Sequence, residues 1–346
     1  MKRKGVALVG LIVAFTIASA ASYVLLTSPS YDNTTLTYRL KWLANTGFVG
    51  DLYADNYGLY TEEGLEVLVE PGGPENNPIR GLGTGRVEFG VASSDQVIRA
   101  LAKADTANGN QRKLVVIAQI YHQNPVRWIH RSPSVMVDDS SDLEQYSIGV
   151  TAGDTDETIF RALENKYKLN LSTREVSYSY APFFNESVDL FPVYLNTQGV
   201  EIKRQMASSG IKTAFFNPTD YGVNIASNSI VTTARKIREE PDTVRAFLRA
   251  TLKGWREALD KENLEKSINV MASHTDFDKS KADSVRSILR RKIQYTRKLV
   301  VPADEESIGT IDTTAWKQAE KIMLKQGLIR RRVGIVDHIN SSYLPR

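Results

Sequence analysis

The sequence contains no cysteine and only four histidines. The absence of cysteine excludes disulfide bonds, thiolate metal ligands and a lipid anchor on a mature N-terminal cysteine. The histidines are His122, His130, His274 and His338, and their spacings match no metal-binding motif. We therefore expect neither a metal site nor a bound cofactor.

A large excess of either charge is also missing. The 346 residues include 44 Lys and Arg against 40 Asp and Glu, so the formal net charge is +4. This small excess does not indicate a nucleic-acid partner. Only the basic clusters at residues 290–292 and 330–332 could contribute to such a binding surface. With 42% hydrophobic residues, the chain can bury one large core or two lobes.

Motifs of nucleophilic catalysis are not found. No histidine accompanies a Gly-x-Ser-x-Gly turn, and adjacent carboxylates such as Glu62 and Glu63 are typical of solvated faces. The sequence therefore gives no support for an enzyme.

The first 26 residues combine a basic start with an apolar stretch. Three basic residues at positions 2–4 precede residues 6–26, which are uncharged, and a cleavage site of the A-x-A type ends at Ala20. This pattern predicts a secretory signal peptide or, alternatively, a retained transmembrane anchor, because the stretch is long enough to span a bilayer. In either case we expect an exported protein on the periplasmic or extracellular face, with residues 27–35 as a linker.

The next part of the chain alternates strands and helices. Apolar residues recur at every second position in residues 38–42 and 65–69, which predicts two strands around a helix at residues 50–60. A second helix near residues 77–83 precedes a third strand at residues 87–91. This order is typical of βαβ units and a parallel sheet.

Three polar loops directly follow predicted strands, at residues 43–47, 92–95 and 151–157. The first turn of a helix at such a junction has N–H groups without partners, and open α/β sheets bind ligands in the crevice there. We therefore predict ligand contacts from all three loops.

The sequence also resembles a known family, from about residue 37 to about residue 260. The motifs that carry the resemblance are Lys41-Trp42, Gly58-Leu59-Tyr60, Glu63-Gly64-Leu65-Glu66-Val67, Gly85-Arg86-Val87-Glu88-Phe89-Gly90 and Ser94-Asp95-Gln96. Their order is similar to that in the thiamine-pyrimidine/sulfonate/nitrate-type periplasmic solute-binding proteins of ABC transporters.

The resemblance implies a two-lobe α/β fold with the ligand cleft between the lobes. Each lobe is expected to hold a mixed, mainly parallel sheet flanked by helices. Lobe 1 is expected at residues 36–121 and 224–346, and lobe 2 at residues 122–223, with hinge closure at the two crossings. The expected partners are a small organic molecule and the membrane subunits of an ABC importer, and the protein itself is expected to be a monomer.

The candidate ligand-binding residues lie at the three loops, at one glycine turn and at the two crossings. They are Trp42, Asn45, Thr46, Gly72, Ser93, Ser94, Asp95, Gln96, Gln123, Thr151, Asp154, Thr155, Asn217 and Tyr221. Gln123 is included because the resemblance implies a ligand-facing segment at the first crossing.

Several of these residues also have a structural interpretation. Trp42 could stack on a flat ring or belong to the core, and Asn45 could contact a ligand or cap a helix. Asp95 could pair with an amine or act only as a helix cap. If it does face the crevice, it favours an aminopyrimidine or amine-like ligand over a sulfonate or nitrate.

Two further functions stay open at this point. A membrane-tethered sensor or scaffold would retain residues 6–26. An enzyme of the pyrimidine-synthase type is the other alternative, but the family's synthase depends on a cysteine-rich segment, and this chain has no cysteine.

Overall fold

The computed structural model describes residues 35–104, 113–276, 279–301 and 307–345. The chain from Thr35 onward groups into one compact unit. The expected signal peptide or anchor, and all of the expected linker except Thr35, lie outside the described residues. Across the described part of the chain, no helix has the length and apolar character to cross a membrane.

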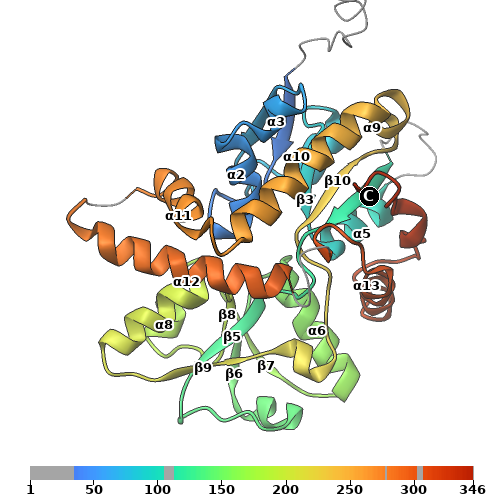
Figure 1. The fold of residues 1–346 in the computed structure, drawn as a ribbon. Coiled ribbons are helices and arrows are strands. Elements are labelled where there is room, and N and C mark those ends of the chain that lie inside the picture. Colours follow the sequence, from blue (N-terminus) through green and yellow to red (C-terminus); the bar gives the residue numbers. More distant parts are fainter. Residues whose placement is uncertain (1–34, 105–112, 277–278, 302–306, 346) are drawn as a thin grey trace, which may run out of the picture. The chain divides into compact units, whose positions relative to one another are not determined.

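A five-stranded mixed sheet forms the first layer of the fold (Figure 1). Its order is β2 (Val67–Glu70), β1 (Leu36–Arg39), β3 (Phe89–Ala92), β10 (Ser229–Thr233) and β4 (Leu114–Gln119). The strands β2, β1 and β3 run parallel, whereas β10 is antiparallel to both of its neighbours. The sheet therefore has a parallel half, as the βαβ pattern predicts, and one reversed strand that enters late in the chain.

Two smaller sheets are built entirely from the chain between β4 and β10. One is antiparallel, with the order β8 (Phe191–Tyr194), β5 (Val126–Arg131) and β9 (Thr213–Phe216). The other pairs β6 (Ser147–Val150) with β7 (Ser172–Glu175) in parallel. The sheets thus follow the predicted crossings in sequence, although the division into two lobes itself stays a prediction.

Helices flank these sheets and complete the α/β fold. The longer ones are α2 (Val49–Asn56), α4 (Pro78–Thr84), α5 (Ser94–Lys103), α6 (Thr155–Tyr167), α8 (Gln198–Ser208), α9 (Ala234–Glu239), α10 (Pro241–Leu259), α11 (Leu264–Ser273), α12 (Ala282–Val300) and α13 (Thr313–Lys325). The short ones are η1 (Thr46–Phe48), α3 (Leu59–Glu62), η3 (Ser140–Gln145), α7 (Ala181–Phe184), η4 (Pro218–Tyr221), η5 (Lys279–Lys281) and η7 (Ile335–His338).

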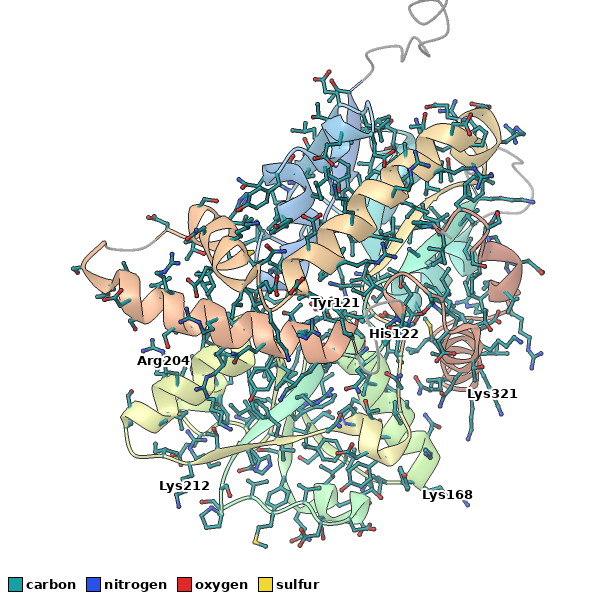
Figure 2. The ribbon with its side chains drawn as sticks, in the orientation of Figure 1. Tyr121, His122, Lys168, Arg204, Lys212 and Lys321 are labelled. Carbon is teal, nitrogen blue, oxygen red and sulfur yellow. The ribbon has the colours of Figure 1, made fainter. Side chains whose placement is uncertain are left out.

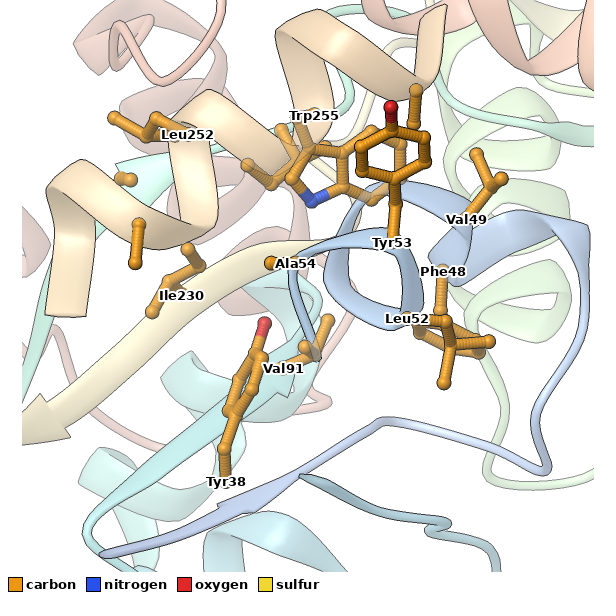
Figure 3. Close-up of a cluster of buried hydrophobic side chains, with 14 of the residues drawn as sticks. Tyr38, Phe48, Val49, Leu52, Tyr53, Ala54, Val91, Ile230, Leu252 and Trp255 are labelled. Atoms are coloured by element: carbon orange, nitrogen blue, oxygen red, sulfur yellow. The ribbon is translucent and has the colours of Figure 1, made fainter. Parts of the chain in front are cut away.

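The largest hydrophobic core lies between the five-stranded sheet and helices α2 and α10 (Figure 3). Phe247 of α10 stacks on Phe89 of β3, with ring centroids 3.8 Å apart. The two helices approach closely because Gly50 of α2 faces Trp255 of α10: a Cβ on Gly50 would lie 2.2 Å from Trp255 Cδ2. This packing fixes the position of the β1–α2 loop, where the sequence predicts ligand contacts.

A buried carboxyl group lies inside this core. Asp51 of α2 accepts hydrogen bonds from the Tyr38 hydroxyl at 2.8 Å and from Trp255 Nε1 at 2.9 Å. Burial raises the pKa of Asp51 to about 7, although both hydrogen bonds act to lower it.

Several basic side chains lie at the surface instead. Lys168, Arg204, Lys212 and Lys321 are all exposed (Figure 2).

Candidate functional site

The candidate site is a cavity of about 270 Å³. Its walls come from the loop after β1, the turn after β2 and the start of α5, from the segment between β4 and β5, and from the loop before α6. The segment after β7, the end of β8 with the residues that follow it, and Asn228 just before β10 complete the walls. This volume is just below the range of about 300–1,000 Å³ that is typical of small-molecule pockets. The cavity therefore suits a metabolite of modest size.

Four predicted residues line this cavity: Trp42, Asn45, Gln96 and Asp154. Asn45 caps η1, because its Oδ1 accepts from Gly47 N at 2.7 Å while its Nδ2 donates to the Leu43 carbonyl at 2.8 Å. Gln96 caps α5, with Oε1 accepting from Ser93 N at 3.2 Å. Asn45 and Gln96 thus combine the capping role with a place in the cavity wall.

Aromatic rings form much of the lining. Trp42 packs against Tyr178, with ring centroids 4.8 Å apart and an interplanar angle of 52°. Phe48, Tyr121 and Tyr194 also line the cavity. Trp42 is only partly buried and Tyr178 is 57% exposed, so both rings retain surface on which a flat ligand could stack.

A buried lysine lies at the edge of the cavity. The Lys41 ammonium donates to Tyr194 OH at 3.0 Å, Ser93 Oγ at 3.3 Å and Thr155 Oγ1 at 3.5 Å. Thr155 in turn donates to the Asp95 carboxylate at 3.3 Å. Its hydroxyl thus links the cation of Lys41 to the anion of Asp95, so neither charge is buried without a counter-charge nearby.

Electrostatics keep Lys41 protonated at neutral pH. Burial lowers its pKa, but Tyr194 and the carboxylates of Asp95 and Asp154 outweigh burial, so that the pKa of Lys41 is raised above its ordinary value. Lys41 therefore gives the cavity wall a positive charge, while its three ammonium hydrogens are donated to Tyr194, Ser93 and Thr155, and it does not act as a free amine.

Four other predicted residues at the starts of α5 and α6, namely Ser93, Ser94, Asp95 and Thr155, are buried and do not line the cavity. The charge of Asp95 therefore gives no direct argument for an amine-like ligand in this structure, and a ligand contact of these four residues stays a prediction. The carboxylate that does line the cavity is Asp154.

Three other predicted residues pack around the cavity without lining it. Thr46 is buried and donates to the Asn196 carbonyl at 3.0 Å. Gly72 packs against the main chain of the residues that follow β1, so that a Cβ added at Gly72 would lie 2.0 Å from the Leu40 oxygen. Thr151 donates its N–H to the Asp156 carboxylate at 2.6 Å.

The structure places the predicted residues at the crossings away from the cavity lining. Gln123 is exposed. Asn217 caps η4 by accepting from Thr219 N at 3.2 Å. Tyr221 packs on Phe216, with ring centroids 5.0 Å apart. For these three residues the structure shows local structural roles, and a ligand contact stays a prediction.

Several lining residues were not among the predicted ones. They are Lys41, Gly47, Phe48, Gly73, Pro74, Asn77, Tyr121, Pro125, Ala152, Gly153, Tyr178, Tyr194, Asn196, Thr197, Gln198 and Asn228. Lys41 had a signal in the sequence, because it directly precedes Trp42 at the first strand-to-helix junction. Asn196 and Asn228 had none, since they reach the cavity through strand ends far apart in sequence.

The described residues contain no group of three or more His, Asp or Glu side chains that could hold a metal ion. The chemistry of the cavity is therefore that of aromatic faces, amide groups, one cation and one carboxylate.

Comparisons with known proteins add the family. A protein-family model described as NMT1/THI5 like matches residues 45–263, which is more than half of the chain. The chain belongs to this family. The match begins at Asn45 in the cavity wall and ends after α10, so the NMT1/THI5-like region includes every lining residue except Lys41 and Trp42.

Two curated proteins are similar along most of the NMT1/THI5-like chain. The riboflavin-binding protein RibY of Chloroflexus aurantiacus is 22% identical over 330 residues, which cover 90% of this chain and 86% of that protein. A formylaminopyrimidine-binding protein of Halalkalibacterium halodurans is 24% identical over 250 residues, covering 70% and 71%.

Solved structures share the fold at lower identity. The alkanesulfonate-binding protein SsuA from Xanthomonas axonopodis pv. citri, bound to MOPS, is 14% identical with a TM-score of 0.63, over 88% of this chain and 98% of that one. A ligand-binding component of an ABC-type import system from Staphylococcus aureus has a TM-score of 0.61 at 12% identity, over 90% and 97%. The desulfurization enzyme DSZB also matches, with a TM-score of 0.57 at 13% identity, over 89% and 97%. These likenesses confirm the periplasmic-binding-protein fold expected from the sequence.

Proposed function

We propose that this protein is an exported solute-binding protein that captures a flat, nitrogen-containing heteroaromatic molecule for an ABC importer. The observation that carries the proposal is the lining of the cavity, which combines aromatic rings and amide side chains with Lys41 and Asp154. Aromatic faces stack on flat rings, and amides, a cation and a carboxylate suit the mixed donors and acceptors of a heterocycle.

The relatives support this ligand class. Riboflavin and formylaminopyrimidine, named for the two curated relatives, are both nitrogen heterocycles. The sulfonate-binding structure shares only the fold at 14% identity, so its ligand weighs less in the choice. Export is supported by the basic and apolar pattern of residues 2–26.

Binding without catalysis fits the chemistry of the cavity better than an enzyme does. The one lysine of the lining, Lys41, is protonated at neutral pH, so it is no amine nucleophile. Among the described residues that line the cavity, there is no histidine to act as a general base. The shared fold of DSZB is a likeness of fold alone and does not carry its activity to this chain.

Tryptophan fluorescence tests the proposal. The sequence has four tryptophans, and Trp128, Trp255 and Trp316 are fully buried, so Trp42 is the tryptophan positioned to report on the cavity. Riboflavin and formylaminopyrimidine serve as probes, with MOPS as the sulfonate comparison, and calorimetry gives the affinity.

We expect at least one heterocycle to bind, to change the emission and to be recovered chemically unchanged. Trp42→Ala should weaken binding by about 5- to 150-fold, because stacking of a base on an aromatic ring contributes about 1–3 kcal/mol. Trp42→Phe should reduce the fluorescence change, because the emission of Trp42 is lost, and should retain more of the affinity than Trp42→Ala, since it keeps an aromatic face. Preferential binding of MOPS, or conversion of either heterocycle, would contradict the proposal.

A further inference from the structure

Two buried amide oxygens in the cavity wall have no hydrogen-bond partner. They are Oδ1 of Asn196 and Oδ1 of Asn228, and both side chains line the cavity. Asn196 is 1% exposed and Asn228 is 5% exposed. Buried polar groups in native proteins are nearly always paired, because an unpaired group loses its hydration without compensation. We refer to these two residues as the amide pair.

The amino group of Asn196 is fixed by two hydroxyls. Its Nδ2 donates to Tyr121 OH at 2.9 Å and to Thr296 Oγ1 at 2.8 Å. Each hydroxyl donates its own hydrogen to a main-chain carbonyl. Tyr121 donates to that of Gly47 at 3.1 Å, and Thr296 to that of Thr46 or Lys292, both at 3.1 Å. Rotating the amide by half a turn would break this chain of donors, so Oδ1 of Asn196 is held as the free acceptor.

The second amide is oriented by the same carbonyl. Nδ2 of Asn228 donates to the Gly47 oxygen at 3.2 Å, and that oxygen cannot accept from an amide oxygen in its place. Oδ1 of Asn228 is therefore also left as an acceptor. Both oxygens have almost no surface that a water molecule can touch, whether from the cavity or from outside, so neighbouring wall atoms cover them.

Asn45 shows that this arrangement is a distinct feature within the cavity wall. Its Oδ1 accepts from Gly47 N and its Nδ2 donates to the Leu43 carbonyl, and so its oxygen is not an unpaired acceptor. The unpaired acceptors belong to the amide pair. Because both residues line the cavity, a ligand that displaces the wall atoms covering the two oxygens would pair with them.

We propose that the amide pair selects a ligand that presents N–H donors to Asn196 and Asn228, with Thr296 of α12 as a positioning residue for Asn196. This inference rests on the proposed function and names the hydrogen-bond pattern of its ligand. It also gives a role to α12, which lies beyond the family-matched residues 45–263. The positive charge of Lys41, whose three ammonium hydrogens are donated within the protein, favours an acceptor atom on the same ligand.

Calorimetry with paired probes tests the inference. Riboflavin and formylaminopyrimidine are each compared with a derivative in which one N–H is replaced by N–methyl. We expect the full-length protein to prefer the N–H form. Asn196→Leu and Asn228→Leu should each weaken binding of the N–H form by about 2- to 12-fold, the size of one neutral hydrogen bond, and should reduce the preference over the N–methyl form.

Thr296 offers a matched pair of variants. Thr296→Val removes the hydroxyl that holds Asn196 and should reduce the preference for the N–H form, whereas Thr296→Ser keeps the hydroxyl and should restore it. Asn165→Ser, at an exposed position of α6 outside the cavity lining, should change neither quantity. Circular dichroism and thermal unfolding establish that each variant is folded.

The outcomes separate this inference from the proposed function. Equal affinity for the N–H and N–methyl forms would overturn the inference while leaving the heteroaromatic ligand in place. If neither heterocycle binds, the proposed function fails for both probes. An atomic-resolution crystal structure of the unliganded protein then decides whether the two amides are oriented as the inference requires. Asn196 Oδ1 facing Tyr121 and Thr296 would overturn the inference, and Nδ2 facing them, with ordered water on both Oδ1 atoms, would support it.

Discussion

Replacing Asp51 by Asn should increase stability at neutral and alkaline pH and remove a pH dependence. Asp51 is buried in the core below the cavity, and its pKa is raised from 3.8 to about 7, chiefly by burial. An acid with a raised pKa binds its proton more tightly in the folded protein than in the unfolded chain. Its contribution to stability is therefore fully present below about pH 4 and is lost as the pH rises through 7.

The magnitude follows from the two pKa values. They differ by about three pH units, and each unit corresponds to about 1.36 kcal/mol, so wild-type protein should lose about 4 kcal/mol between pH 4 and pH 8 through this group alone. Asn has nearly the same shape, and its carbonyl oxygen can accept from Tyr38 and Trp255 as the carboxyl does. Asp51→Asn should therefore keep the fold and lose this slope.

Urea unfolding of both proteins at several values between pH 4 and pH 8.5 measures the effect. The free energy of unfolding of Asp51→Asn minus that of wild type should rise by about 4 kcal/mol across this range and level off above pH 7. Asp156, whose pKa burial also raises to about 7, contributes equally to both proteins and cancels in the difference. If the free energies of unfolding of the two proteins change with pH in the same way, Asp51 is not held protonated by its surroundings, and the reasoning from burial is refuted.

Three further substitutions test the packing and the limits of the site. Gly50→Ala should destabilise the protein by about 3 kcal/mol, the upper end for overpacking, because its Cβ would overlap Trp255. Gly83→Ala, with no atom within 4 Å of the new Cβ, should stabilise the protein by about 0.5–1 kcal/mol. Thermal unfolding compares the two variants, and similar midpoints would contradict the close approach of α2 and α10. Asn217→Ser should leave ligand affinity unchanged by calorimetry, because serine can still cap η4 and Asn217 does not line the cavity; a clear loss of affinity would restore Asn217 as a ligand residue.

The order of strands and helices in the first hundred residues could be predicted from local patterns. Strands expected at residues 65–69 and 87–91 correspond to β2 (Val67–Glu70) and β3 (Phe89–Ala92), and the helix expected at residues 77–83 corresponds to α4 (Pro78–Thr84). Periodicity and capping residues act over a few positions, and a single sequence reveals them directly.

The place of β10 could not be predicted in the same way. The run Ile230-Val231-Thr232-Thr233 by itself predicts a short strand, but its antiparallel pairing between β3 and β4 depends on contacts more than a hundred residues apart in sequence. No local pattern encodes such a partner.

The same reason limits the prediction of the site. Trp42, Asn45, Gln96 and Asp154 lie at strand-to-helix junctions, and the junction rule found them. The alternation of apolar and polar residues at positions 38–42 predicts that Lys41 lies on the polar side of a strand. In the structure β1 ends at Arg39, so the alternation does not extend to Lys41, and this side chain is buried. The Asp95 carboxylate lies on the buried side of its helix start, which a sequence cannot distinguish from the open side.

The late position of β10 in the chain has a consequence for how the protein is made. Within the five-stranded sheet β4 pairs only with β10, so the sheet cannot close until residues 229–233 have left the ribosome and, in an exported protein, have crossed the membrane. Until then β3 and β4 each have an edge with open hydrogen-bonding groups, the kind of surface on which unfinished chains aggregate. We therefore expect maturation to depend on a holding chaperone, with truncations before residue 229 accumulating as insoluble protein.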